Sequence, residues 1–357
     1  MAGKDISVSR ILKLAQQFNC FYLSGFPYNK FLQVKSDLTL IRQGDLYRDM
    51  PAHDFKLRRA TYQGLQSGTS WPFIVAGKQV GLVRPDVLSK LSKYPEVFSI
   101  QKNCVTLNPA FRDYTERSAK VEEVLKECRA QETFITLKGW RDECFDVRAG
   151  YSAEALLKMD RCATCLFGIC NYGVDINGYV MDPEKGLCIW LQRRSQTKQT
   201  WPGRWDNMVG GGLAVGYGVL ETAYKEAEEE ASIPSELMKN LRSGGSVSFF
   251  FESERGLFPN TEFVFDLELP CDFIPKNNDG EVEMFELLPA KEALVRVLSK
   301  DFKTTSCPVV LDFLIRHGII TPDSEPHFPE LVELLHVPLQ SLYRVRSCAE
   351  NGEIYSS

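Results

Sequence analysis

The spacing of apolar residues predicts that the first 150 residues alternate between helices and short strands. Apolar residues recur at near-helical spacing over residues 1–20, whereas residues 73–83 form short apolar runs on either side of a turn at Gly77. The expected helices are residues 1–20, 86–93 and 112–130, the second opened by Pro85, and the expected strands lie in 73–83 and 140–147. We therefore expect a first α/β domain over residues 1–150.

After residue 150 the pattern favours a sheet with helices on its faces. A connecting helix is expected over residues 151–167, and one strong helix, 219–232, interrupts the strands that follow it. The expected strands are 168–180, 188–194, 246–251 and 261–269, and the later helices are 289–300, 308–317 and 328–336. This alternation predicts an α+β fold with a mixed sheet over residues 151–320, followed by a C-terminal helix and tail over residues 321–357.

Composition then limits the partners and the compartment. The chain has 357 residues with 42 basic and 47 acidic side chains, and its net charge of −5 argues against a dedicated nucleic-acid binder. No apolar run approaches the roughly 20 residues needed to span a bilayer, so no membrane partner is expected. The 11 cysteines are scattered, and no N-terminal stretch has the apolar segment of a signal peptide. We therefore expect a cytoplasmic protein whose cysteines are buried thiols.

The candidate chemistry lies on the helix over residues 219–232, where three acidic residues share one face. At about 100° per residue, Glu229 and Glu230 lie roughly 60° and 40° to either side of Glu226. Like charges crowded in one arc are unfavourable unless a cation neutralises them, and closely spaced carboxylates suit Mg²⁺ or Mn²⁺. A solvated helix face is the alternative interpretation. The three glycines at 210–212 favour a metal-assisted phosphate site, because they let the backbone pass close to a ligand.

Residues 211–233 resemble the Nudix box, whose pattern is G-x5-E-x7-R-E-U-x-E-E-x-G-U, where U is aliphatic. Gly211 takes the place of the first glycine, and the three acids match those of the REUxEE segment. Three positions depart from the pattern: Tyr217 replaces its first glutamate, Lys225 its arginine and Ser232 its second glycine. Lysine keeps a cation beside the acids but lacks the bidentate fork of arginine, and the missing first acid bears on metal affinity.

The resemblance extends over almost the whole chain. The runs IWLQRRSQTKQTWPGRWDNMVGGGL, LELPCDFIPKNNDGEVEMFELLP and VVLDFLIRHGIIT, with WRDECFDV ahead of them, are similar to a two-part Nudix family. That family is related to the N-terminal half of fungal thiamine pyrophosphokinase and to certain plant Nudix hydrolases, and it carries a smaller domain ahead of the Nudix fold. The resemblance implies hydrolysis of a small-molecule diphosphate. The expected substrates are oxo- and oxythiamine diphosphate, which would yield the monophosphate in metabolite repair.

The resemblance also implies which residues hold the metal and which take the proton. The ligands of Mg²⁺ or Mn²⁺ would be the carbonyl of Gly211 and the side chains of Glu226, Glu229 and Glu230. The proton of the attacking water would go to one of these carboxylates or to an acid outside the box. The outside candidates are Glu281, which we prefer, and Glu283, and a solvated turn is the alternative interpretation for this pair.

Basic residues ahead of the box are candidate ligands of the substrate phosphates. Arginine binds phosphate oxygens through two parallel hydrogen bonds, whereas lysine acts as a point charge. The candidates are Arg193, Arg194, Lys198 and Arg204. Ordinary surface charge is the alternative interpretation for each of them.

Two other functions fit parts of the sequence. The run RRSxxKxTWPGxWDNxxGG also resembles isopentenyl-diphosphate isomerase, but that enzyme needs an N-T-C-C-like segment and a histidine after the double glycine, and both are missing here. A non-catalytic Nudix-fold binding module is the second alternative, since the box departs at three positions. Retention of all three acids favours the hydrolase. The sequence leaves the oligomeric state open.

Overall fold

The computed structural model describes residues 10–18, 70–343, 347–348 and 354–355, which form two compact units. The seven-strand unit contains helix α1 (Arg10–Phe18) and residues 171–249 and 260–337. The four-strand unit contains residues 70–170 and 250–259 and the described residues from 338 onward. The expected helix over residues 1–20 is thus present as α1, and its first nine residues lie outside the described part of the chain.

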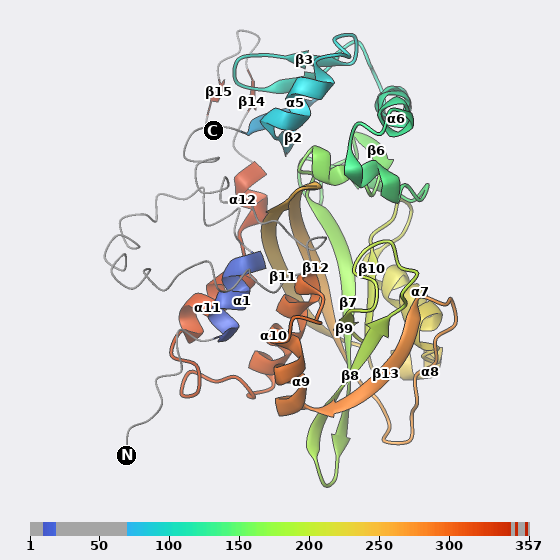
Figure 1. Cartoon of the computed structure of the whole chain (residues 1–357), viewed down its shortest axis with the longest axis vertical. Coiled ribbons are helices and arrows are strands. Elements are labelled where there is room, and N and C mark those ends of the chain that lie inside the picture. Colours follow the sequence, from blue (N-terminus) through green and yellow to red (C-terminus); the bar gives the residue numbers. More distant parts are fainter. Residues whose placement is uncertain (1–9, 19–69, 344–346, 349–353, 356–357) are drawn as a thin grey trace. The chain divides into compact units, whose positions relative to one another are not determined.

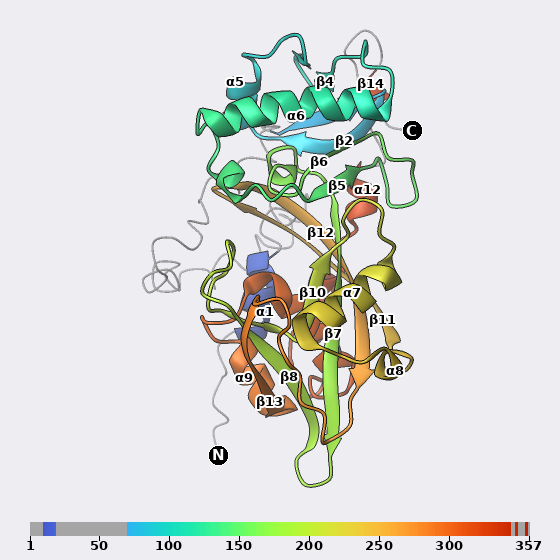
Figure 2. The same ribbon diagram turned by 90° about the vertical axis from the view of Figure 1, so that its right-hand side faces the viewer.

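A small mixed sheet and two helices make up most of the four-strand unit. The strands, in the order β2-β1-β4-β3, are β1 (Trp71–Val75), β2 (Lys78–Val83), β3 (Phe98–Ile100) and β4 (Val105–Leu107). The helices are α5 (Pro85–Leu91), α6 (Tyr114–Ala130) and the 3₁₀ turn η2 (Ile135–Gly139). Helix α6 runs along the sheet (Figure 2), and the Asp113 carboxylate caps it by accepting a hydrogen bond from the Glu116 amide. The expected turn at Gly77 is confirmed, and its φ of 74° is one that glycine adopts without strain.

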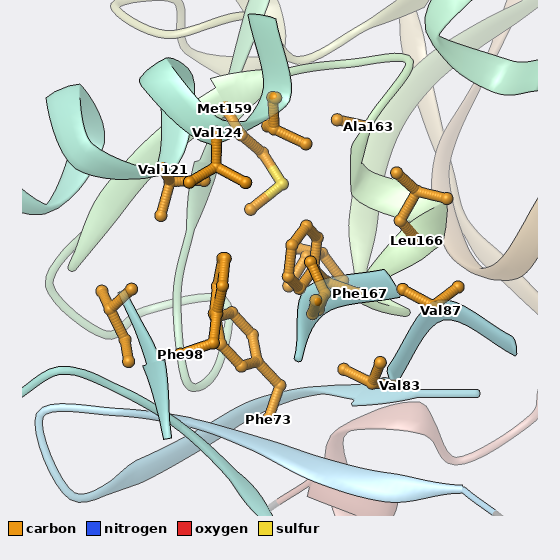
Figure 3. Close-up of a cluster of buried hydrophobic side chains, with 14 of the residues drawn as sticks. Phe73, Val83, Val87, Phe98, Val121, Val124, Met159, Ala163, Leu166 and Phe167 are labelled. Carbon is orange, nitrogen blue, oxygen red and sulfur yellow. The ribbon is translucent and has the colours of Figure 1, made fainter. Parts of the chain in front are cut away.

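Three buried aromatic rings form the centre of this unit. Figure 3 shows Phe73 of β1, Phe98 of β3 and Phe167 gathered between the sheet and the side chains of α6. The ring centroids of Phe73 and Phe167 are 4.9 Å apart, and those of Phe98 and Phe167 are 5.7 Å apart. Such pairs add to the free energy gained by burying apolar area. The core of the unit therefore depends on a residue that lies outside its own sheet, Phe167.

The connecting helix predicted over residues 151–167 is wrong. The segment instead contains strand β6 (Leu157–Asp160), which pairs antiparallel with β5 (Cys144–Val147), and the short 3₁₀ turn η3 (Thr164–Leu166). Leu157 and Met159 are buried and Lys158 between them is exposed, which is the period of a strand. Because this segment ends in the Phe167 core, the units divide at residues 170 and 171, twenty residues later than the predicted domain boundary.

The other unit is built on a seven-stranded mixed sheet, which confirms the predicted fold class (Figure 1). Its main path is β11-β12-β7-β8-β13, with β10 paired to β7 and β9 to β8. The strands are β7 (Asn171–Asp182), β8 (Gly186–Arg194), β9 (Trp205–Asn207), β10 (Val209–Gly212), β11 (Arg242–Ser253), β12 (Gly256–Glu268) and β13 (Val282–Pro289). β12 runs parallel to β7, whereas β8 and β10 run antiparallel to it.

Helices cover both faces of this sheet because the side chains of its strands alternate. Phe265 and Leu267 of β12 pack with helix α7, whereas Val264 between them packs with Val309 of α10. The helices are α7 (Val219–Ala231), α8 (Ser235–Met238), α9 (Ala290–Val297), α10 (Cys307–Arg316) and α11 (Phe328–Leu335), with the 3₁₀ turn η4 (Thr304–Ser306) before α10. The expected helices 308–317 and 328–336 correspond to α10 and α11. The expected helix 289–300 corresponds to α9, which is four residues shorter. Helix α12 (Leu339–Tyr343) belongs to the four-strand unit.

We predict that Phe167→Ala lowers the free energy of unfolding by about 3–5 kcal/mol, because it removes a fully buried ring and leaves a cavity between Phe73 and Phe98. Urea unfolding followed by circular dichroism measures the change. The control is Ile135→Ala in the same unit, where the side chain is 55% exposed and a change within about 0.5 kcal/mol is expected. Equal effects of the two substitutions would contradict the central position of Phe167.

Candidate functional site

Helix α7 is held against the sheet by a row of alanines. Ala223, Ala227 and Ala231 are fully buried and pack on residues of β7 and β12, so the helix lies close to the strands (Figure 2). Of the acids on the neighbouring arc, Glu226 consequently lies against β10 and Glu230 contacts β10 and β8. Glu228, on the other side of the helix, is exposed.

The end of α7 explains one of the departures from the box pattern. Ser232 has a φ of 51°, in the left-handed region that favours glycine at a helix end. Its hydroxyl donates a 2.8 Å hydrogen bond to the carbonyl of Lys276. Serine therefore takes the conformation that the pattern assigns to glycine, and the hydrogen bond offsets part of the strain.

Glu226 lies directly on the backbone of β10. A Cβ atom at Gly211 would stand 2.3 Å from both Cγ and Cδ of Glu226, so only glycine leaves room for this side chain. The glycine residues were expected to let the backbone pass close to a ligand. In this structure the group that passes close to Gly211 is one of the three acids themselves.

Glu230 is the most deeply buried of the three acids, with 2% of its surface exposed. Its Oε2 accepts hydrogen bonds from the backbone amide of Gly210, at 2.9 Å, and from Nε2 of Gln192, at 3.2 Å. Burial raises the pKa of Glu230 to about 8, although the Gly210 hydrogen bond acts in the opposite direction. A buried carboxylate of this kind is stabilised in its ionised form by a nearby cation.

Lys225 forms ion pairs with the other two acids in this structure. Its Nζ lies 2.7 Å from Oε2 of Glu229 and 3.2 Å from Oε1 of Glu226. Partial burial lowers the pKa of Lys225, but hydrogen bonds and charge from these two carboxylates outweigh burial and raise it. The departure from arginine thus preserves an ion pair on the helix.

The donor set fits a hard divalent cation. It consists of the Gly211 carbonyl and three carboxylates, all of them oxygen donors of the kind that Mg²⁺ and Mn²⁺ prefer. One lysine offsets three acids, so the face keeps an excess of negative charge. Within the described residues no three acidic, histidine or cysteine side chains already converge at metal-binding positions, so the acids would have to draw together around an ion.

Strands β7 and β12 add two acids that no motif identified. A Cβ at Gly173 would stand 2.0 Å from Oε2 of Glu262 and 3.1 Å from the carbonyl oxygen of Gly211. Glu262 therefore lies beside the backbone oxygen that was predicted to bind metal. Asp175 is buried, and burial, with a smaller effect from Glu262, raises its pKa well above the usual value. In the sequence, each of these acids is visible only as a charged residue inside an expected strand. The sequence alone does not tell which face of the sheet such a residue lies on.

The structure gives Arg194, a predicted phosphate ligand, buried partners within the protein. Its guanidinium is buried, pairs with Oδ2 of Asp206 at 3.0 Å, and donates to the carbonyls of Thr200 and Trp201. Lys303 also contacts Asp206, at 2.9 Å. Burial raises the pKa of Asp206, but these two cations more than offset it and lower the pKa. Through these bonds Arg194 holds the loop after β8 in place.

The other three basic candidates lie in different surroundings. Lys198 forms an ion pair with Glu281, so the structure brings a predicted phosphate ligand and the preferred proton acceptor together. Arg204 donates to the carbonyl of Lys300. Arg193 is partly exposed, and its Nε donates to the Gly203 carbonyl at 3.2 Å. The substrate-binding role of all four stays a prediction, and Arg194 is the one whose guanidinium is buried.

Comparison with known proteins identifies the class of this domain. A family model described as the NUDIX domain matches residues 171–307, and one described as a domain of unknown function (DUF4743) matches residues 53–171. The boundary between the two matches coincides with the division between the units. The seven-strand unit is therefore a Nudix domain.

The similar proteins cover most of the chain. Nudix hydrolase 24, chloroplastic, of Arabidopsis thaliana is 35% identical over 267 residues, which are 73% of this chain and 72% of that protein. Nudix hydrolase 20, chloroplastic, of the same plant is 33% identical over 279 residues, 75% and 74% of the two chains. Uncharacterized protein YJR142W of Saccharomyces cerevisiae is 33% identical over 293 residues, 77% and 85% of the two chains.

The chain thus belongs to the Nudix hydrolase family and is a Nudix-type pyrophosphohydrolase that cleaves diphosphate bonds. Nudix hydrolases generally use divalent metals such as Mg²⁺ or Mn²⁺. The similarity to fungal thiamine pyrophosphokinase stays a prediction. Within the described residues, no helix has the length and apolar content needed to cross a bilayer.

We predict that Gly211→Ala reduces hydrolysis by about 10- to 100-fold, because the added Cβ displaces Glu226 and small misplacements at a reacting centre have effects of this size. Phosphate release measures activity, and thermal unfolding checks that the variant is folded. The control is Gly218→Ala, where the new Cβ would meet nothing closer than 3.4 Å and φ is −83°. Full activity of the Gly211 variant would show that the position of Glu226 is not critical.

We predict that Arg194→Met lowers the free energy of unfolding by about 3 kcal/mol, because it removes a partner from the buried Asp206 carboxylate. Chemical denaturation measures the loss. The neighbouring change Arg193→Met, at a partly exposed guanidinium, is expected to stay within about 0.5 kcal/mol of the wild type. A stable Arg194→Met protein with an increased KM would instead support the substrate-binding role.

Proposed function

We propose that this chain hydrolyses thiamine-type diphosphates, namely oxo- and oxythiamine diphosphate, to the monophosphate in a metal-dependent reaction that serves metabolite repair. The observation that carries the catalytic part is the placement of Glu226, Glu229 and Glu230 on one face of α7, where Glu226 and Glu230 contact the glycine strand β10. The substrate class rests on the resemblance to the two-part family. The expected cytoplasmic location also stays a proposal, since two of the relatives are named chloroplastic.

The residues that would hold the metal are the Gly211 carbonyl and the three acids of α7. When bound, Mg²⁺ or Mn²⁺ supplies positive charge that offsets the diphosphate and makes water a better nucleophile at neutral pH. Lys225 must release Glu226 and Glu229 when the acids take up another cation, because its Nζ contacts both carboxylates. The exchange keeps charge balanced on this face of the helix.

Glu281 is the preferred acceptor of the proton from the attacking water. Lys198 pairs with its carboxylate, which holds this side chain beside the loop after β8. The backbone amide of Ser195 donates to the Glu281 carbonyl at 2.8 Å and so fixes this turn to the end of β8. The water oxygen attacks the terminal phosphorus, the bridging P–O bond breaks, and the monophosphate leaves with inorganic phosphate. A box carboxylate remains the alternative base.

An aromatic pair next to the glycine strand supports a ring-containing substrate. Tyr172 and Phe263 lie side by side with ring centroids 6.3 Å apart, and both are partly exposed. Tyr172 precedes Gly173, which pairs with Gly212 of β10. The rings therefore offer a flat apolar surface on which a heteroaromatic ring can stack.

The test is phosphate release from oxythiamine diphosphate with Mg²⁺. We predict that Glu229→Gln and Glu230→Gln each reduce the rate by at least about 100-fold. Residues that only orient a metal ligand already affect metal affinity or activity by up to about 100-fold, and loss of a ligand itself should cost at least as much. Glu228→Gln is the matched control on the exposed side of the same helix and keeps the wild-type rate.

Two results would overturn different parts of the proposal. If the wild type turned over no diphosphate at all, the chain would be a Nudix-fold binding module. If it hydrolysed nucleoside diphosphate derivatives and left thiamine-type diphosphates intact, only the substrate assignment would fail.

A further inference from the structure

Gln192 is a buried polar residue on β8 whose side chain is only half satisfied. It is 1% exposed and lies between Asp206 of β9 and Phe285 of β13 in the sheet register. Its Nε2 donates to Oε2 of Glu230 at 3.2 Å, while its Oε1 has no hydrogen-bond partner among the described residues. Leaving a buried amide oxygen without a partner costs about 1–3 kcal/mol, so the position needs a reason other than stability.

The side-chain amide of Gln192 faces Glu230. The NH₂ group of Gln192 points toward Glu230, whose Oε2 accepts its hydrogen bond at 3.2 Å. The unpartnered oxygen is bonded to the same carbon as this nitrogen, and it therefore lies beside the carboxylate without touching a donor.

We propose that Gln192 is a positioning residue for the divalent cation of this site. Its amide nitrogen fixes the orientation of Glu230. Its amide oxygen is a neutral ligand for the ion or for a water molecule bound to the ion. This inference rests on the proposed metal-dependent function. Amide oxygens suit Mg²⁺ and Mn²⁺, and residues that orient a metal ligand affect metal affinity by 10- to 100-fold.

The proposal predicts a clear loss of metal affinity with little change in metal-free stability. Gln192→Met keeps the length of the side chain and removes both polar atoms. It eliminates the unpartnered oxygen but also takes one donor from the buried Glu230, and because these two effects oppose each other metal-free stability should change little. Mn²⁺ affinity should fall at least tenfold, because Glu230 loses one of its two donors and the ion loses a neutral oxygen. A glutamine with a purely structural role would lower metal-free stability and leave Mn²⁺ affinity unchanged.

The experiment titrates Mn²⁺ alone into the full chain and follows free Mn²⁺ by electron paramagnetic resonance, with thermal unfolding measured in the absence of metal. The matched control is Gln79→Met. Gln79 is also buried, at 4% exposed, and its Oε1 is also unpartnered among the described residues, but it belongs to the four-strand unit. This control should bind Mn²⁺ as the wild type does.

A second variant covers the case in which Gln192→Met does not fold. Gln192→Glu keeps the Oε1 oxygen and replaces the amide nitrogen with a second oxygen. It sets a second acid beside Glu230, so the stability of the site depends more on a cation. We expect Mn²⁺ to raise the melting temperature of this variant by more than it raises that of the wild type. An equal or smaller increase would overturn the proposal.

The outcomes separate this inference from the proposed function. Unchanged Mn²⁺ affinity in Gln192→Met, an equal loss in Gln79→Met, or no Mn²⁺ binding by the wild type would each overturn the role of Gln192. Weaker Mn²⁺ binding in Gln192→Met supports it, even if the wild type hydrolyses no thiamine-type diphosphate. In that last case the substrate assignment fails and the metal site stands.

Discussion

The site depends on one close contact, in which Glu226 rests on the bare backbone of Gly211. The alanine row of α7 brings the helix near enough to the sheet for this contact to form, and the absence of a Cβ on β10 leaves the space for it. Because helix, strand and Glu226 are fixed by the same packing, the backbone that carries the acids is held in position, and only the acidic side chains have to draw together around an ion. A backbone fixed in this way lowers the cost of assembling a charged site.

The three acids of α7 have different partners. Glu230 is buried and held by a backbone amide and by Gln192, whereas Glu226 and Glu229 share the ammonium group of Lys225. One acid is thus fixed by hydrogen bonds, and two share one ammonium group. This arrangement leaves two carboxylates able to exchange their partner.

The sequence predicted some parts of the site better than others. The three acids could be identified because helical spacing depends only on neighbouring residues and because the box pattern specifies many positions in a short segment. The sequence could not predict the burial of Arg194 or its pairing with Asp206, because both depend on how the loop after β8 returns to β9. Glu262 was missed because its neighbour Gly173 is 89 residues away in the chain, and only the pairing of β12 with β7 brings the two together.

The sequence by itself determined the α+β class, the main helices and the three acids of the Nudix box, since these follow from local periodicity and a short motif. Tertiary structure decided the domain boundary, the fate of residues 151–167 and the partner of each charged group. Phe167 joins a core whose other members lie in distant strands, and that burial outweighs the helical tendency of the segment before it. Similarly, only the folded sheet determines that Gly211 lies beneath Glu226, and hence why glycine stands there.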